Sequence, residues 1–363
     1  MIRKEKGFCL HSSVSARIIV LVLGLLVMVT AQAMASDEPI GQVVYVEGNP
    51  LVVRGGQDLG DTVDFGFSIY NMDQISTDSE SMVEVSITNE SGLDARIIIE
   101  PDSDLYLAAD DSQGDFRVNL LQGNSSFEVD HLPRQQSFSV RTAMATMGVR
   151  GTKFSVDVAA QGEFLVATES GRVEVANEEN DAIMAVPGRA VEMTYEDGFR
   201  SFELEIGQER NFRQTWRQRR LDVLRANPDV ALQRFATRYR NARDRFEILY
   251  QELLEHQDII DQWIQDDRQN RRPALTLTMR QKAEIARPLM RIAAHLVIFE
   301  RVYFRVRQLR TLLADASFNN PSVNPREFFR EFDRDAAVLR QRMNMIRYVT
   351  RLYAQRNNGR LPF

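Results

Sequence analysis

Apolar and polar residues alternate with a period of two along the first half of the chain. Short alternating runs recur about every ten residues between Gly, Asn, Asp or Pro, as expected for consecutive strands; they include residues 83–87, 118–120, 127–129, 138–140 and 173–175. Such a period places one face of each strand against a core. The pattern predicts an all-β region over residues 40–205, built as a sandwich, a barrel or a short solenoid, and it does not distinguish these three.

From Glu203 onward, apolar residues recur at steps of three and four. The three stripes that they form run from Leu232 through His256 to Trp263, from Ile285 to Leu313 with an interruption at Arg310, and from Phe329 to Tyr353. Sustained heptad-like stripes with short connections predict a long antiparallel helical bundle over residues 207–356. The change of period predicts a multidomain chain, all-β then all-α, whose two halves fold separately.

Several local features refine the predicted helices. Asn227-Pro228 and Asn324-Pro325 favour helix starts, because Asn caps free amides and Pro fits the first helical position. Residues 207–226 form the first segment of the helical part, but their stripe is irregular, and a connector is the alternative. Pro288 predicts a kink in the second long helix. The stripes place Leu296, Phe299 and His256 in the core, Arg301 on a polar side, and residues 357–363 in a frayed tail.

Charge divides the chain where the period changes. Residues 36–206 contain 10 Lys and Arg against 32 Asp and Glu, net −22, and residues 207–363 contain 31 against 18, net +13. Arginine supplies almost all of this positive charge, since Lys282 is the only lysine after residue 206. Two interpretations remain open: a basic surface for an anionic polymer, a lipid head group or an acidic protein, or a solvated helix face with pairs such as Arg243 and Glu247. Acidic residues interrupt every basic run, which disfavours nucleic acid.

The amino terminus has the pattern of a secretory signal peptide over residues 1–35. An apolar run of 12 residues, 18–29, ends before Ala33-Met-Ala35 and follows Arg3, Lys4, Lys6 and Arg17. The run is shorter than the ~20 residues of a spanning helix. We expect cleavage after Ala35, with an uncleaved anchor as the alternative. Cleavage would also remove Cys9, the single cysteine, and leave neither disulfides nor thiolate metal sites.

Residues that could carry chemistry are few and dispersed. His131, His256 and His295 lack the spacing of a zinc motif, and no nucleophile elbow, phosphate loop or dinucleotide fingerprint is present. A group of carboxylates near Gly114 offers calcium-type oxygens without a regular ligand spacing, as is also typical of solubilising turns; it comprises Asp102, Asp104, Asp110, Asp111 and Asp115. We therefore expect no catalytic residue, no metal and no cofactor.

The most specific pattern lies in residues 142–156, Thr-Ala-Met-Ala-Thr-Met-Gly-Val-Arg-Gly-Thr-Lys-Phe-Ser-Val. Phe154, Val156 and Val158 alternate with polar residues and predict a strand entered through Gly148 and Gly151. This stretch resembles the signature of the FecR-type domain family. The matching residues, which we expect to be structural, are Thr142, Gly148, Val149, Arg150, Gly151, Thr152 and Phe154.

The resemblance extends over about half of the chain. Further segments similar to the family's strands are residues 41–54, 72–77, 82–87, 171–175 and 187–191. Two features depart from the family: Ala143 replaces the usual proline, and residues 89–92 replace an Asp-Gly-Ser turn. The resemblance implies a periplasmic domain that receives a signal from an outer-membrane receptor, while a cytoplasmic segment controls a sigma factor. Only 17 residues precede the apolar run, too few for that segment.

We therefore expect a periplasmic, non-catalytic sensing or interaction module of the bacterial envelope, with an envelope protein as partner. The alternative is a structural envelope protein whose basic helical bundle binds peptidoglycan, anionic lipid or an acidic protein. Neither the ligand nor the oligomeric state follows from the sequence.

Overall fold

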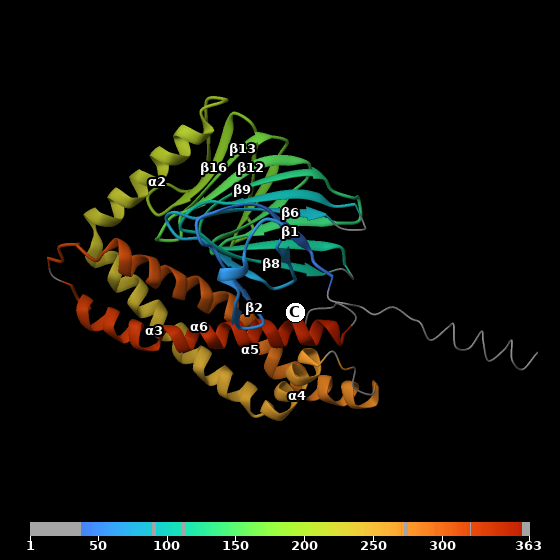
Figure 1. Ribbon diagram of the computed structural model, residues 1–363. Coiled ribbons are helices and arrows are strands. Elements are labelled where there is room, and N and C mark those ends of the chain that lie inside the picture. Colours follow the sequence, from blue (N-terminus) through green and yellow to red (C-terminus); the bar gives the residue numbers. More distant parts are fainter. Residues whose placement is uncertain are drawn as a thin grey trace, which may run out of the picture. The chain divides into compact units, whose positions relative to one another are not determined.

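The computed structural model describes residues 38–88, 92–110, 113–269, 271, 275–319 and 321–357. The predicted signal peptide, Asp111 and residues 358–363 lie outside them. Residues Pro39–Phe363 form one compact unit. Within its described part, seventeen strands precede five α-helices, which confirms an all-β region followed by an all-α region. In Figure 1, α2 runs beside the sheets and leads to the other helices, which lie together on one side of them.

The strands form two sheets that share the long strand β9 (Asp115–His131). The first sheet contains β4 (Ser68–Ile69), β1 (Gly41–Glu47), β6 (Met82–Thr88), β7 (Asp94–Ile99), the second half of β9, β12 (Thr152–Val158), β13 (Phe164–Ser170), β16 (Arg189–Thr194) and β17 (Gly198–Glu203). The second contains β3 (Gln57–Asp58), β2 (Leu51–Arg54), β5 (Gln74–Ser76), β8 (Asp104–Asp110), the first half of β9, β10 (Ser137–Arg141), β11 (Ala145–Val149), β14 (Val173–Asn177) and β15 (Ala182–Ala185). Pairing is antiparallel throughout, except that β9 and β10 run parallel.

Strand β9 passes from one sheet to the other at Gly123. This residue has a φ of 83°, and a Cβ atom here would lie 2.5 Å from the carbonyl oxygen of Asp102. Only glycine allows both the left-handed backbone and this close approach. Apolar side chains of both sheets then share one core; Val85, Ile97, Phe127, Val140 and Val156 are among its members.

The five helices are α2 (Glu209–Ala226), α3 (Pro228–Leu254), α4 (Gln257–Arg268), α5 (Leu275–Leu312) and α6 (Pro325–Gln355). As predicted, Pro228 and Pro325 begin their helices, and the Asn324 side chain accepts a 3.2 Å hydrogen bond from the Glu327 backbone N–H. Pro288 lies inside α5. The apolar stripes of α3 to α6 are buried in one core cluster, which removes their apolar surface from water.

Two helix predictions were wrong. The first long stripe is not one helix, because α3 ends at Leu254 and α4 begins at Gln257. His256 precedes α4 as its capping residue and is half-buried rather than packed in the core. Apolar residues keep their spacing across this break and no Gly or Pro marks it, so the stripe conceals it. Residues 209–226 are not a connector but the helix α2.

The second sheet is buried on two faces where the helices cover it. Leu105 and Leu107 of β8 point into the core between the sheets, whereas Tyr106 and Ala108 belong to the helical core. The expectation that each strand buries only one face is therefore wrong for β8. Tertiary packing of a helical layer on the sheet makes both sets of side chains inaccessible to water.

Replacing Leu296 by aspartate should lower the free energy of unfolding by about 3–5 kcal/mol, because Leu296 is 5% exposed and lies in the helical core. Urea unfolding measures this change. The solvated residue that serves as control is Arg245, which is exposed on α3; Arg245→Gln should leave the midpoint unchanged. Equal shifts in Leu296→Asp and Arg245→Gln would contradict the core assignment.

The prediction that Arg301 lies on a solvated side was wrong. Arg301 is half-buried and donates a 2.8 Å hydrogen bond to the carbonyl of Ala143.

Candidate functional site

The sequence motif forms β11, β12 and the turns beside them. The Thr142 hydroxyl is buried and accepts a 3.2 Å hydrogen bond from the Ala145 backbone N–H, which fixes the turn before β11. Gly151 has a φ of 60° in the turn between the strands. Thr152 then donates to the carbonyl of Arg172, at 3.1 Å. These contacts join consecutive strands.

The remaining motif residues divide between the core and the surface. Phe154 stacks on Phe127 with 4.9 Å between ring centroids, and Val149 is also buried. Gly148 lies inside β11, not at the strand entry where we predicted it. Arg150 is exposed and makes no ion pair or hydrogen bond with another described residue. Structural packing therefore accounts for Phe154 and Val149, but not for Gly148 and Arg150.

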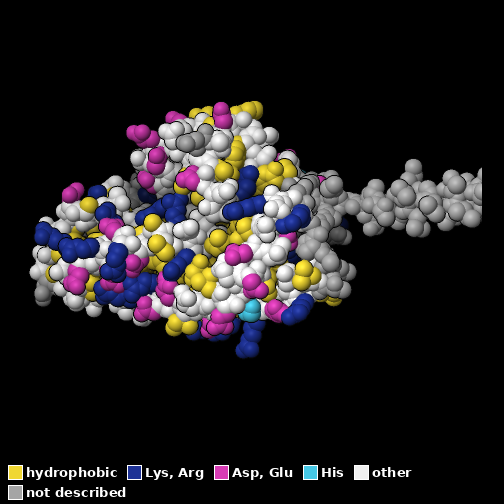
Figure 2. All heavy atoms as spheres, turned by 60° about the horizontal axis from the view of Figure 1, so that its bottom comes forward, with side chains coloured by type: hydrophobic (Ala, Val, Ile, Leu, Met, Phe, Trp, Pro, Cys, Tyr) yellow, Lys and Arg dark blue, Asp and Glu magenta, His cyan; other side chains and the backbone are white. Residues whose placement is uncertain are grey.

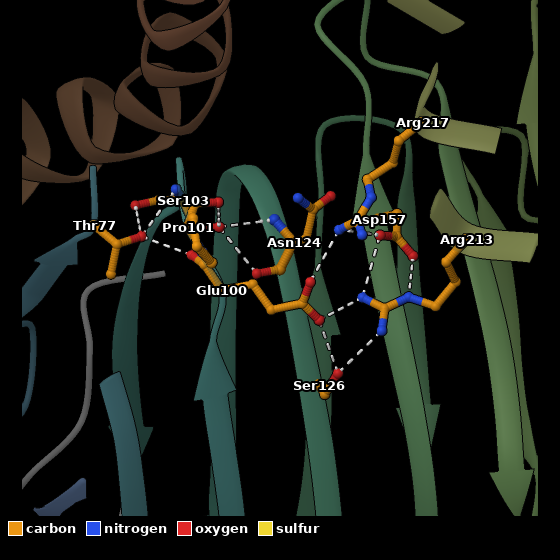
Figure 3. A network of polar contacts seen from close by, with 9 residues as sticks. All are labelled: Thr77, Glu100, Pro101, Ser103, Asn124, Ser126, Asp157, Arg213 and Arg217. Atoms are coloured by element: carbon orange, nitrogen blue, oxygen red, sulfur yellow. Dashed lines mark hydrogen bonds and ion pairs between the residues drawn. The ribbon is translucent and has the colours of Figure 1, made fainter. Parts of the chain in front are cut away.

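Buried ion pairs attach α2 to the first sheet (Figure 3). Arg213 donates from Nε to Asp157 Oδ2 on β12 and from Nη2 to Glu100 Oε1 beside β7, both at 2.6 Å. Arg217 donates to the second oxygen of Glu100 at 2.9 Å. Asp157 is 0% exposed. A buried carboxylate needs such partners, because an isolated charge is strongly disfavoured away from water.

The two carboxylates of this network differ in their proton affinity. Burial raises the pKa of Asp157, and Arg213 offsets only part of this effect. Burial also acts on Glu100, but Arg213 and Arg217 outweigh it and hold its pKa below the usual range. A lowered pKa in the folded state stabilises the fold at neutral pH, and this contribution is lost as the pH falls through that value. The raised pKa of Asp157 has the opposite sign and favours the folded state on acidification.

The second half of α2 packs on the far end of the same sheet. Trp216 is buried against Leu165 and Ala190, and its Nε1–H donates to Glu192 at 2.8 Å. Arg220 contacts Glu163 at 3.1 Å. The residues of α2 that are buried follow a regular helical spacing: Glu209, Arg213, Trp216, Arg220 and Leu224. The sequence left this segment open between helix and connector, because three of the five residues carry charge and were not counted in an apolar stripe.

Comparison with known proteins identifies the domain that carries this site. Residues 73–174 match the family model described as FecR protein. The predicted resemblance is confirmed. The FecR-type match includes Glu100 and Asp157 and most of the motif strands, but not the helices.

Solved structures give a weaker likeness. Two crystal structures, at 2.50 and 1.65 Å resolution, of a protein from Parabacteroides distasonis described as a "putative anti-sigma factor" each share 20% identity with this chain at a TM-score of 0.32. The alignment covers 38% of this chain and 62% of the other, so less than two thirds of that protein's length is represented here. No curated protein sequence matches the chain.

The region that matches the FecR model also receives arginines from α5 and α6. Arg347 forms a 2.5 Å ion pair with the fully buried Glu300 and donates to Gln74 of β5 at 2.7 Å. Arg307 pairs with Asp104, which is buried in β8. Arg305 of α5 is also buried here and donates to the carbonyl of Ala159. The arginines thus bind carboxylates and amides of the same chain.

The helical arginines form ion pairs between helices, and not only along one solvated helix face. Arg243 and Glu247, expected to pair with each other, instead pair with α6, as Arg243 with Glu331 and Glu247 with Arg342, each at 2.5 Å. On the face shown in Figure 2, basic and acidic side chains are interspersed. Such mixed surfaces neutralise their own charge over short distances.

The dispersed histidines and aspartates do not gather into a reaction centre. His131 is exposed, and a ring nitrogen of His295 lies 2.9 Å from the carbonyl of Ala242. Of the acidic group, Asp104 is a buried ion-pair partner rather than a solubilising turn residue, and Asp115 accepts from Ser137. Over the described residues, no group of three or more His, Cys, Asp or Glu side chains could hold a metal ion.

None of the helices that the structure describes is both long enough and apolar enough to cross a membrane.

Proposed function

We propose that the chain is an exported, non-catalytic sensing or interaction module of the bacterial envelope, acting in the periplasm on a protein partner. The FecR-type match over residues 73–174 is the observation that carries this proposal. As finer parts of it, we propose that residues 40–205 and 207–356 are two domains, that the first is a two-sheet sandwich or solenoid, and that the second is an antiparallel bundle.

Contacts between the two regions suggest how such a module would transmit a signal. Arg213, Arg217 and Arg220 of α2 bind carboxylates in or beside β7, β12 and β13 of the first sheet. These carboxylates are Glu100, Asp157 and Glu163. Because these ion pairs are largely buried, a displacement of α2 would leave carboxylates such as Asp157 without partners. A partner that binds the strands would therefore change the energy of the helix position, and a partner that binds the helices would act on the strands.

The alternative, a structural protein whose basic helical region binds peptidoglycan or anionic lipid, draws less support. It would have to use exposed arginines such as Arg210, Arg238 and Arg287, because Arg213, Arg220 and Arg347 are buried and paired within the chain. Arginines that are already bound to carboxylates gain little from a further anion.

Cross-linking of the full-length protein in its native envelope should attach a defined protein partner, identified by mass spectrometry of the purified adduct. A variant with the exposed substitution Arg245→Gln should give the same adduct and serves as the matched control. Recovery of only peptidoglycan or lipid adducts would contradict the proposal and support the structural alternative.

Amino-terminal sequencing of the protein from the envelope fraction should give Ser36 as the first residue, because small residues at Ala33 and Ala35 precede it. An intact Met1 end on protein held in the inner membrane would contradict export by cleavage.

A further inference from the structure

The outer face of the second sheet is covered only over part of its width. Tyr106 of β8 and Leu121 of β9 are buried under the helices. On the strands beyond, β11, β14 and β15, the outward residues Gly148, Glu174 and Met184 are exposed. This part of the sheet therefore presents an uncovered surface beside the helical layer.

Strand register places two small residues and two larger ones in one row across that surface. Ser139 pairs with Gly148, Gly148 with Glu174, and Glu174 with Met184, so these four residues form one row across four strands. Directly paired residues share a face of the sheet. A depression of about 290 Å³ lies here, and we call it the β11 hollow; Gln136, Gly148, Arg150, Arg172, Glu174 and Met184 are among the residues that line it.

Gly148 is not required by the fold. Its φ is not in the left-handed region, and a Cβ atom at this position would meet nothing within 4 Å. Glycine inside a strand lowers stability by about 0.5–1 kcal/mol relative to alanine. A glycine inside a strand, where neither backbone nor packing demands it, often marks a place where another chain or ligand approaches the backbone closely.

The polar groups around the hollow favour an acidic occupant. Arg150 and Arg172 are exposed at one end, and neither guanidinium makes an ion pair or hydrogen bond with another described residue. An arginine presents forked donors to carboxylates. Glu174 is the one carboxylate that lines the hollow.

We propose that the β11 hollow binds an extended, acidic segment of a partner protein, with its backbone close to Gly148 and its carboxylates on Arg150 and Arg172. This inference rests on the proposed function, for which it names the binding surface and the partner chemistry. An extended chain fits this surface better than a helix does, because its backbone can approach Gly148 within contact distance. The motif residues that packing leaves unexplained, Gly148 and Arg150, thereby acquire a role.

Fluorescence anisotropy tests this with the full-length mature chain and a fluorescein-labelled peptide of alternating Glu and Thr, at low and physiological ionic strength. The double variant Arg150→Gln/Arg172→Gln should bind about 5- to 10-fold more weakly, as expected for two exposed ion pairs. Gly148→Val should weaken binding at least as much, yet it should keep or raise the thermal midpoint, because the side chain enters open space on a strand. Arg280→Gln/Arg334→Gln removes the same charge from exposed helix positions and should bind like wild type.

Several outcomes would overturn the inference. These are no binding of the Glu–Thr peptide, equal binding of a neutral Gln–Thr peptide, equal weakening by the helix control variant, or self-association of the chain that Gly148→Val abolishes while peptide binding persists. The same variants separate this inference from the proposed function. A cross-linked partner that is unaffected by Gly148→Val would overturn the hollow alone, whereas peptide binding at the hollow without any envelope protein partner would overturn the proposed function alone.

Discussion

Replacing Arg213 by alanine should lower the free energy of unfolding by about 3–5 kcal/mol. The change leaves Asp157, which is 0% exposed, with a longer 3.3 Å contact to Arg217 as its remaining ion pair among the described residues. It also removes a 2.6 Å ion pair with Glu100. Urea unfolding at neutral pH, followed by circular dichroism, measures the loss.

Arg219 provides the matched control for this prediction, because it lies on the same helix and is exposed. Arg219→Ala should leave the unfolding midpoint within experimental error of wild type. Similar losses in both variants would mean that α2 is held by general helix propensity or net charge, and not by the buried ion pairs of Figure 3.

Replacing Glu300 by alanine should have an effect of the same size, about 3–5 kcal/mol, because it leaves the buried Arg347 without its carboxylate. Arg347 would keep the hydrogen bonds to Gln74 and Asn344, each at 2.7 Å, which do not neutralise its charge. The double variant Glu300→Leu/Arg347→Met should be more stable than Glu300→Ala, since it removes both buried charges and keeps most of the volume. A double-mutant cycle on urea unfolding measures the coupling.

The pH dependence gives this prediction an independent check. Burial raises the pKa of Glu300 above its ordinary value. As the pH falls, Glu300 therefore takes up a proton in the folded state at a higher pH than in the unfolded state. Its protonation stabilises the folded state in this pH range. Because the glutamine variant does not titrate at this position, wild type should gain stability relative to Glu300→Gln as the pH falls through the raised pKa. A wild type that loses stability relative to Glu300→Gln in this range would contradict the assignment.

Local patterns in the sequence were sufficient to predict the order of the two regions and much of the buried surface. The period of two and the later steps of three and four depend only on how side chains of one element face a common layer. The Asn324 cap and the Pro starts of two helices depend on residues a few positions apart. Residues 142–156 carried the FecR-type resemblance for the same reason, since turns and strand alternation are local.

These local patterns could not predict polar contacts between segments that are far apart in the sequence. Arg347 and Gln74 are separated by 273 residues, and Arg213 and Glu100 by 113. The charge division of −22 against +13 predicted attraction, but it did not say which arginines are buried, nor that Asp104 is one of their partners. The break at His256 was hidden because the apolar spacing continues across it.

The sequence by itself determined the secondary structure of most segments, the boundary between strands and helices near residue 206, and the faces that become apolar cores. Only the tertiary structure showed that buried ion pairs attach the helix α2 to the first sheet and that β8 is buried on both faces. It also showed that Gly148 lies on an exposed part of the second sheet near Arg150. The physical reason is that periodicity reports the environment that one element requires. A buried ion pair or an uncovered sheet face depends on which other element is packed there.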